Sequence, residues 1–411
     1  MIAASVIMIA GLIFVALLSQ SEGYRLGGVM VLPLLVVYTF REPFSPVIFG
    51  IGAVAAWIAL WLLREYTLSY GRRLFLASVT VGAIGTILAG YALSLAPATQ
   101  LSFESAEVVA SIFPGVTAYN VMRLDPDDRR GDLVAMTAGY LLLVGIGAVS
   151  LWVLAGIDSP TPAVLALPTS DLTHRFGIDP RGNPSATIVS DRITVALLFA
   201  DIVVYEGFRK RYDHRLAGII IIPLLAVFSA RYAPSLVLYA VGATAVYYLL
   251  SYVHWMTLVY GRVLLAISLI LGTAYVLAVG ALQPASAPGI ILFFIGLFVG
   301  IGAYNLHRVS PNNRSAHVRI SAGLFVVFYA VLYALVDILA EGLFHSGHGA
   351  YVVLGVVAVG LALIEMYRFE RSLPDSAAFA RKSVFANASL NDGDLDGSPL
   401  VADTEEEEED R

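Results

Sequence analysis

Cysteine is absent from the 411 residues, so the sequence excludes disulfides and thiol chemistry. Lysine is scarce, with Lys210 and Lys382 standing against 23 arginines. Charged residues make up 14% of the chain, whereas soluble proteins carry about 25%. With 58% hydrophobic residues and a mean hydropathy of +0.79, this shortage of charge predicts an integral membrane protein.

The sequence also lacks the common motifs of enzymes. It has no phosphate-binding loop, dinucleotide fingerprint, zinc-protease motif or serine-hydrolase elbow. His345, His348 and Glu341 are too loosely spaced to indicate a metal site. We therefore expect no catalytic residue, no cofactor and no metal, and any energy must come from a partner or an ion gradient.

Long apolar runs are abundant, and a helix needs about 20 such residues to cross a bilayer. The first run, 1–19, lacks the basic start of a signal peptide, so we expect it to be the first membrane helix. Arginine in place of lysine, the absence of cysteine and a net charge of −6 are typical of a salt-loving archaeon.

The chain repeats itself. At a shift of 190 residues, "RLGGVMVLPLLVVYTFR" (25–41) aligns with "RLAGIIIIPLLAVFSAR" (215–231), and "YGR" recurs at Tyr70 and Tyr260. At a shift of 185, "SIFPGVTAYNVMRL" (111–124) aligns with "GLFVGIGAYNLHRV" (296–309). Three matches in the same order predict a tandem duplication.

The predicted fold is all-α, a polytopic membrane helix bundle of two parallel repeats of about six helices plus one C-terminal helix. The expected organisation is repeat 1 (1–156), an extramembrane linker (157–190), repeat 2 (191–340), a final membrane helix (341–370) and an acidic, disordered cytoplasmic tail (371–411).

The distribution of basic residues predicts the orientation. With thirteen crossings, the odd loops and their flanks hold 15 Lys and Arg and the even loops hold five. The positive-inside rule then places the odd loops and the C-terminus in the cytoplasm and the N-terminus outside. The runs that carry Pro33 and Pro223 are short and could be re-entrant, but five spans per copy would invert repeat 2 against the charge rule.

Two groups of residues are candidates for a binding site or a partner contact. Arg72, Arg73 and Arg262 either anchor the chain to lipid phosphates or bind an anion, since guanidinium groups bind carboxylate and phosphate with two prongs. The second group is Pro114, Gly115, Asn120, Arg123, Asn305 and Arg308.

The second group has two interpretations. Small residues four positions apart, such as Ser111 with Gly115 and Gly296 with Gly300, favour close helix packing. In this interpretation Asn120 and Asn305 cap helix ends. Alternatively, segments interrupted at Pro114 line a shared central site.

Each of the acidic residues has a structural interpretation as well as a functional one. Asp201 lies near the middle of an apolar run, where it is either a functional carboxyl or a partner in a helix–helix hydrogen bond. Asp337 lies at the end of another run and could reach the interface. The stretch 123–132, "RLDPDDRRGD", is expected to be a solvated turn, with partner docking as the alternative.

The motifs of repeat 1 resemble those of the PgsC/CapC family, the membrane subunit of poly-γ-glutamate synthase. Ser21 and Glu22 stand where that family has Thr-Glu, and Asn120 is displaced by one position from the family's asparagine. The remaining matches are Tyr70, Gly71, Arg72, Arg73, Phe75, Gly82, Pro114, Gly115, Ala118 and Arg123. Repeat 2 fits less well, with Val263 and Val299 in place of Arg73 and Pro114.

The resemblance implies a non-catalytic membrane subunit of a complex that makes and exports poly-γ-glutamate. It implies three partners: a cytoplasmic ATP-dependent amide ligase, a surface-anchored subunit and the polyanionic glutamate polymer. The bilayer is a further partner, and no nucleic acid is expected. Two alternatives remain: a stand-alone secondary transporter of a small anion, and a membrane scaffold without a passage.

Overall fold

The computed structural model describes residues 1–67, 71–95, 111–154, 164–165, 191–212, 214, 216–282, 289–336 and 349–372. Most of the predicted linker and nearly all of the predicted tail lie outside these residues. So do Tyr70, Asp337, Glu341, His345 and His348.

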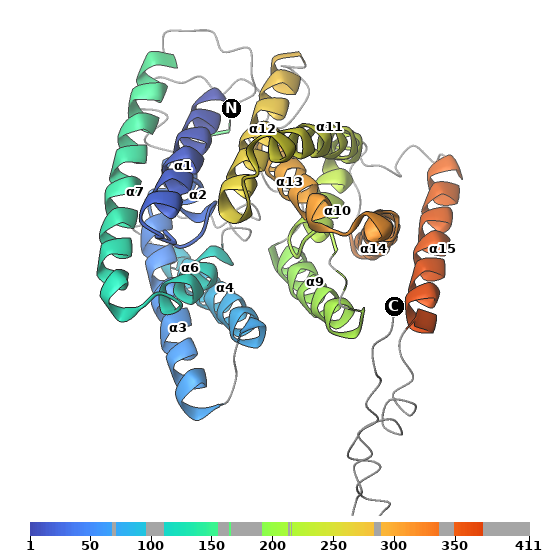
Figure 1. The fold of residues 1–411 in the computed structure, drawn as a ribbon, viewed down its shortest axis with the longest axis horizontal. Helices are drawn as coiled ribbons and strands as arrows, with labels where there is room; N and C mark the ends of the chain where they lie inside the picture. Colours follow the sequence, from blue (N-terminus) through green and yellow to red (C-terminus); the bar gives the residue numbers. More distant parts are fainter. Residues whose placement is uncertain are drawn as a thin grey trace, which may run out of the picture. The chain divides into compact units, whose positions relative to one another are not determined.

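The described residues form thirteen α-helices (Figure 1). Those of repeat 1 are α1 (Ile2–Ser21), α2 (Val31–Arg41), α3 (Ser45–Tyr66), α4 (Arg72–Ser94), α6 (Phe113–Met122) and α7 (Pro126–Leu154). Those of repeat 2 are α9 (Asp191–Tyr212), α10 (Ile221–Arg231), α11 (Pro234–Thr257), α12 (Gly261–Leu282), α13 (Gly289–Arg308) and α14 (Arg314–Leu335), with a short 3-10 turn at Pro311–Asn313. The last helix is α15 (Gly349–Ser372).

Nine of the described helices are long and apolar enough to cross a membrane. They are α1, α3, α4, α7, α11, α12, α13, α14 and α15. Each of them reaches the roughly 20 residues that a bilayer requires. The chain is therefore an all-helical, multi-pass membrane protein, as its composition predicts.

The short helices α2 and α10 have 11 residues each, or about 16 Å, which is half of a hydrocarbon core. In α2 every side chain except Leu35 and Thr39 is buried, and in α10 every side chain except Arg231 is buried. A helix that is apolar all round is buried all round. These two segments are therefore the interior of their repeats rather than lipid-facing spans.

Small residues allow α2 to pack against both α1 and α7, which also pack against each other. A side chain at Gly11 of α1 would come within 2.6 Å of Pro33 Cβ, and one at Gly139 of α7 would come within 3.0 Å of Leu32. Gly28, before α2, has a φ of +132°, and its repeat counterpart Gly218 has a φ of +153°. The turn that leads into each short helix thus uses the same backbone geometry, which L side chains rarely adopt.

Candidate functional site

The two predicted asparagines hold the turns that precede the short helices. Asn120 Nδ2 on α6 donates to the carbonyl of Gly27 over 3.0 Å, and Asn305 Nδ2 on α13 donates to the carbonyl of Ala217 over 2.5 Å. Gly27 and Ala217 are equivalent at the 190-residue shift. Both asparagines therefore bond to another segment instead of capping their own helix ends, which corrects the capping interpretation.

The predicted small-residue contacts occur in both repeats. Ser78 Oγ donates to the carbonyl of Gly115, and Ser268 Oγ donates to that of Gly300, each over 2.6 Å. A Cβ on Gly115 would lie 2.7 Å from Val79 Cα, and one on Gly300 would lie 2.8 Å from Leu269 Cα. These glycines bring two helix backbones into contact, as the packing interpretation expects.

Pro114 lies in the first turn of α6, where a missing N–H costs no helical hydrogen bond. Its counterpart Val299 lies inside α13, which runs unbroken for 20 residues. The two segments differ, so the described residues do not form a matched pair of interrupted helices around a central site.

Next to each of these asparagines, a tyrosine ring stacks with an arginine side chain. The hydroxyl groups of Tyr119 and Tyr304 donate to the carbonyls of Gly71 and Gly261 over 3.2 and 3.1 Å. Arg123 and Arg308 place their guanidinium carbons 5.7 and 5.5 Å from the centres of these rings. Such cation–π contacts hold the arginines at the ends of α6 and α13.

The paired arginines of α4 and α12 reach across to the other repeat. Arg72 Nε donates to Glu206 Oε2 of α9 over 2.6 Å, and the Arg72 guanidinium lies 5.3 Å from the Tyr205 ring centre. Arg262 Nη1 of α12 donates to the carbonyl of Tyr24, just after α1, over 3.3 Å. The two contacts are reciprocal between the repeats: the arginine of α4 contacts α9, and the arginine of α12 contacts the segment just after α1, the counterpart of α9.

Asp132 differs from the sequence-based expectation of a solvated turn. It is fully buried, and its Oδ1 accepts the backbone N–H groups of Arg25 and Leu26 over 2.6 and 2.8 Å. It also interacts electrostatically with the Arg25 and Arg262 side chains. Burial, and then the charge of Arg123, lower the pKa of Arg25.

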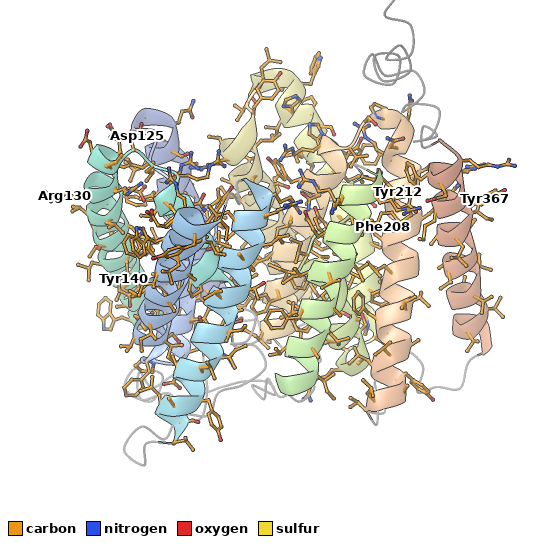
Figure 2. All side chains as sticks on the ribbon, turned by 90° about the horizontal axis from the view of Figure 1, so that it is seen from below. Asp125, Arg130, Tyr140, Phe208, Tyr212 and Tyr367 are labelled. Carbon is orange, nitrogen blue, oxygen red and sulfur yellow. The ribbon has the colours of Figure 1, made fainter. Side chains whose placement is uncertain are left out.

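Five arginines therefore gather on one side of the bundle, which we call the arginine side. They are Arg25, Arg72, Arg123, Arg209 and Arg262, drawn from both repeats. Figure 2 shows Asp125 and Arg130 at the start of α7, and Tyr212 at the end of α9, toward the same upper edge of the view. Of the other predicted arginines, Arg73 is exposed at the start of α4.

The arginine side contains an open pocket of about 410 Å³. It is lined by Gly71, Arg72, Leu74, Phe75, Tyr119, Arg123 and Arg209, and we call it the arginine pocket. Its volume lies within the range of small-ligand pockets, about 300–1,000 Å³. Two of its arginines, Arg72 and Arg123, were predicted candidates. The third, Arg209, belongs to repeat 2.

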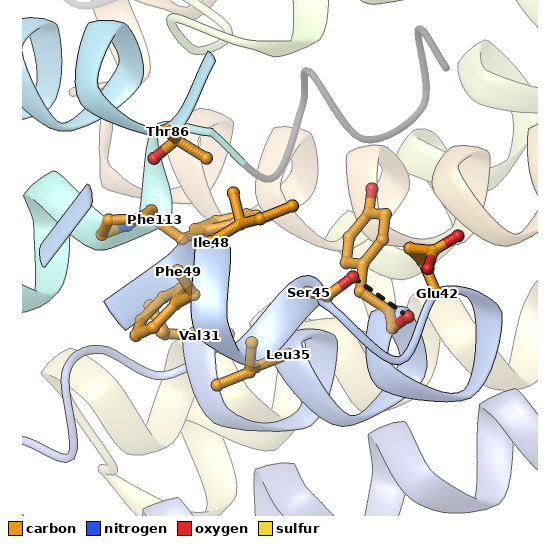
Figure 3. Close-up of a pocket in the computed structure, with 10 residues that line it drawn as sticks. Val31, Leu35, Glu42, Ser45, Ile48, Phe49, Thr86 and Phe113 are labelled. Carbon is orange, nitrogen blue, oxygen red and sulfur yellow. Dashed lines mark hydrogen bonds between the residues drawn. The ribbon is translucent and has the colours of Figure 1, made fainter. Parts of the chain in front are cut away.

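A second, apolar pocket lies between α2, α3, α4 and α6 (Figure 3). Its volume is about 40 Å³, which has room for a water or two. Ser45 Oγ closes one side by donating to the carbonyl of Tyr38 over 3.3 Å, and burial raises the pKa of the nearby Glu42. This pocket is a packing gap rather than a ligand site.

In repeat 2 a histidine pair replaces the Asp132 contact. His214 and His317 correspond to Tyr24 and Asp132 at the two repeat shifts, and their ring centres lie 6.1 Å apart. Burial, and then His317, lower the pKa of His214 to about 4. The turn before α10 is instead held by Ser321 Oγ, which accepts the Ala217 N–H over 3.2 Å.

Asp201 of α9 is fully buried, and neither of its carboxylate oxygens has a hydrogen-bond partner among the described residues. The hydrogen-bond interpretation of this residue therefore has no support in the part of the chain described. No group of three or more metal-ligating side chains occurs within these residues either.

Sequence reasoning did not single out Glu206 or Arg209 as site residues, and it placed Asp132 in a solvated turn. Glu206 and Arg209 are three residues apart on α9, and a signal for them exists in the repeat alignment. Their counterparts in α1 are Ala16 and Ser19, so both charges are special to repeat 2. Asp132 carried no comparable signal, because acids and arginines surround it in the sequence.

Residues 10–130 and 201–315 each match the sequence profile of the family described as capsule biosynthesis CapC. The two segments together span more than half of the chain. The protein belongs to the capsule biosynthesis CapC family. Two separate matches in one chain agree with a tandem duplication of the family unit. No curated protein and no solved structure matches the chain.

Membership of the CapC family makes this chain a membrane protein of capsule biosynthesis. The family also implies a place in a capsule synthase complex. Each match includes the short buried helix and the asparagine-bearing helix of its repeat, α2 with α6 and α10 with α13.

Proposed function

We propose that this CapC protein is a non-catalytic membrane subunit of a complex that synthesises and exports poly-γ-glutamate. The observation that carries the proposal is the arginine side, where cations of both repeats meet at the end of a membrane bundle. A polycarboxylate is the natural counterpart of such a surface, because clustered guanidinium groups attract and orient carboxylates.

In this proposal the arginine side faces the cytoplasm. There it docks a cytoplasmic ATP-dependent amide ligase and receives the growing polymer, while a surface-anchored subunit takes the polymer on the outer face. The N-terminus is outside and the C-terminus is cytoplasmic. The partners follow from the family resemblance, and the charge of the arginine side supports them.

The proposal includes parallel repeats of six helices, with α2 and α10 completing their crossings through the turns that precede them. The support is the grouping of Arg72, Arg209 and Arg262 near Arg123. In an inverted repeat, Arg72 and Arg262 would lie at opposite ends of the bundle. In a parallel repeat, related by an axis along the membrane normal, they lie at the same end.

Deletion of the gene in its host tests the function. We expect extracellular poly-γ-glutamate to disappear and to return when the wild-type gene is restored. Unchanged extracellular polymer in the deletion strain would refute the proposal. Gradient-driven uptake of a small anion by the purified protein alone in liposomes would favour the stand-alone transporter instead.

Single-cysteine labelling tests the orientation, and the native chain contributes no background because it has no cysteine. Asp128→Cys and Asn313→Cys mark equivalent exposed positions of the two repeats. Pro43→Cys marks an exposed position in the turn between α2 and α3, which is expected on the other side of the membrane. With a membrane-impermeant maleimide, we expect Pro43→Cys to react in intact cells and the other two only after permeabilisation. Opposite accessibility of Asp128→Cys and Asn313→Cys would refute parallel repeats.

A further inference from the structure

We propose that the arginine pocket binds a ligand with two or more carboxylates, and that Glu206 occupies the place of one carboxylate while the pocket is empty. This inference deepens the proposed function and rests on it. The pocket would be the point at which an acidic chain first contacts the membrane subunit.

The charge balance of the pocket favours an anion. Among the described residues that line the pocket or pair with its lining, there are three arginines, Arg72, Arg123 and Arg209, and one carboxylate, that of Glu206, which pairs with Arg72. The site therefore has an excess of two positive charges when all four groups are ionised. Like charges this close repel one another, and a ligand with two carboxylates would neutralise the excess.

The Arg72–Glu206 pair leaves one donor unused. Glu206 Oε2 accepts a hydrogen bond from Arg72 Nε, whereas Arg72 Nη2 is buried and has no partner among the described residues. A carboxylate can bind the Nε and Nη2 groups together with two parallel hydrogen bonds. A ligand carboxylate seated in this way would satisfy a buried donor that Glu206 leaves open.

The remaining lining residues are held in place for a ligand. Tyr119 is fixed by its hydrogen bond to the Gly71 carbonyl and packs edge-on against Phe75, with ring centres 5.1 Å apart. Arg123 stacks on the Tyr119 ring. Arg209 lies one turn after Glu206 on α9. The pocket thus brings the Tyr119–Arg123 stack of repeat 1 against a partly exposed ion pair with repeat 2.

Only one such pocket is expected in the chain. The counterpart of Arg72 is Arg262, but the counterparts of Glu206 and Arg209 are Ala16 and Ser19. The second repeat retains the stack of Arg308 on Tyr304 without the other charges. Arg308 is therefore a matched control, with the same stack on a tyrosine and with Ser19 at the position equivalent to Arg209.

The test measures binding of a fluorescent γ-linked glutamate oligomer to the full-length protein in phosphatidylcholine nanodiscs. We expect Arg123→Gln and Arg209→Gln each to weaken binding about fivefold, the value of one partly exposed ion pair, and Arg308→Gln to leave it unchanged. Glu206→Gln should strengthen binding by a similar factor, because it removes the competing carboxylate. Higher salt should weaken all of these affinities.

The direction of the Glu206→Gln effect decides the question. If the Arg72–Glu206 pair serves only to join the repeats, Glu206→Gln lowers the melting temperature without strengthening binding, and the inference is overturned. Absence of oligomer binding to the wild type, or equal losses in Arg308→Gln and Arg123→Gln, also overturns it. If Arg209→Gln does not fold, Arg209→Lys keeps the charge without the fork and should bind with intermediate affinity.

Two further arms separate the possible ligands and the two proposals. Inorganic phosphate and phosphatidylglycerol carry the same oxyanion chemistry as a carboxylate, so each is added as a competitor. Removal of oligomer binding by phosphatidylglycerol would make a lipid headgroup the occupant and would refute the carboxylate ligand. If the oligomer does not bind but gene deletion abolishes the polymer, the pocket inference fails and the proposed function stands.

Discussion

Replacement of Gly82 by alanine should destabilise the bundle, because the contact it blocks is made by backbone. A Cβ at Gly82 of α4 would lie 2.6 Å from Gly115 Cα, and nearer still to the Gly115 nitrogen. Backbone atoms cannot rotate away as a side chain can. Helices α4 and α6 would have to separate by about 1 Å to restore a normal van der Waals distance.

Overpacking of a well-packed interior costs about 1–3 kcal/mol, and the backbone contact places Gly82→Ala at the upper end. A loss of about 3 kcal/mol corresponds to a fall of roughly 4 °C in melting temperature for a chain of this length, because the entropy of unfolding scales with the number of residues. Gly272→Ala should behave in the same way, since its Cβ would lie 2.9 Å from the Gly300 nitrogen.

The assay is thermal unfolding of the purified protein in detergent, followed by tryptophan fluorescence and by size-exclusion chromatography. Gly50→Ala is the control, because a Cβ at Gly50 of α3 meets no atom within 4 Å. Alanine is the better helix former, so this variant should be as stable as the wild type or slightly more so. A Gly82→Ala protein that melts within about 2 °C of the control would refute the close approach of α4 and α6.

Two further predictions concern the turns before the short helices. Asn120→Ala and Asn305→Ala should each cost about 1 kcal/mol, the value of one hydrogen bond, and a double variant that loses no stability would contradict the structure. Because the pKa of His214 is lowered to about 4 in the fold, the unfolded chain binds more protons below about pH 6.5. The free energy of unfolding should therefore fall as the pH drops from 6.5 toward 4. The fall should be smaller in His214→Gln, which removes this titrating group and leaves His317 in place. An equal fall in both proteins would refute this assignment.

The repeat alignment predicted more of the fold than hydropathy alone. It matched Gly28 with Gly218 and Asn120 with Asn305, and each pair has the same backbone geometry or hydrogen bond in both repeats. Hydropathy could not show that α2 and α10 are buried on all sides, because lipid and a protein interior select the same apolar residues. The lengths of those runs were the signal, and they indicated short segments.

The arginine pocket could not be predicted, because it forms between repeats. A sequence shift shows which residues are equivalent but does not show that Arg72 of α4 meets Glu206 of α9. Asp132 was misread for a related reason. Its neighbours in the sequence are charged and exposed, whereas its partners, the N–H groups of Arg25 and Leu26, lie more than 100 residues away.

The contacts shared by the repeats and those that differ fall into separate sets. The serine, asparagine and tyrosine hydrogen bonds recur in both copies and fix helices to one another. The contacts of Arg72 and Asp132 do not recur: Arg72 donates to Glu206, whereas its counterpart Arg262 donates to a carbonyl, and His317 stands in place of Asp132. Two identical CapC units in a homodimer would present two identical pockets. Fusion in one chain allows Glu206 and Arg209 to arise on one side only, so a single acidic chain could be engaged without competition from a second, equal site.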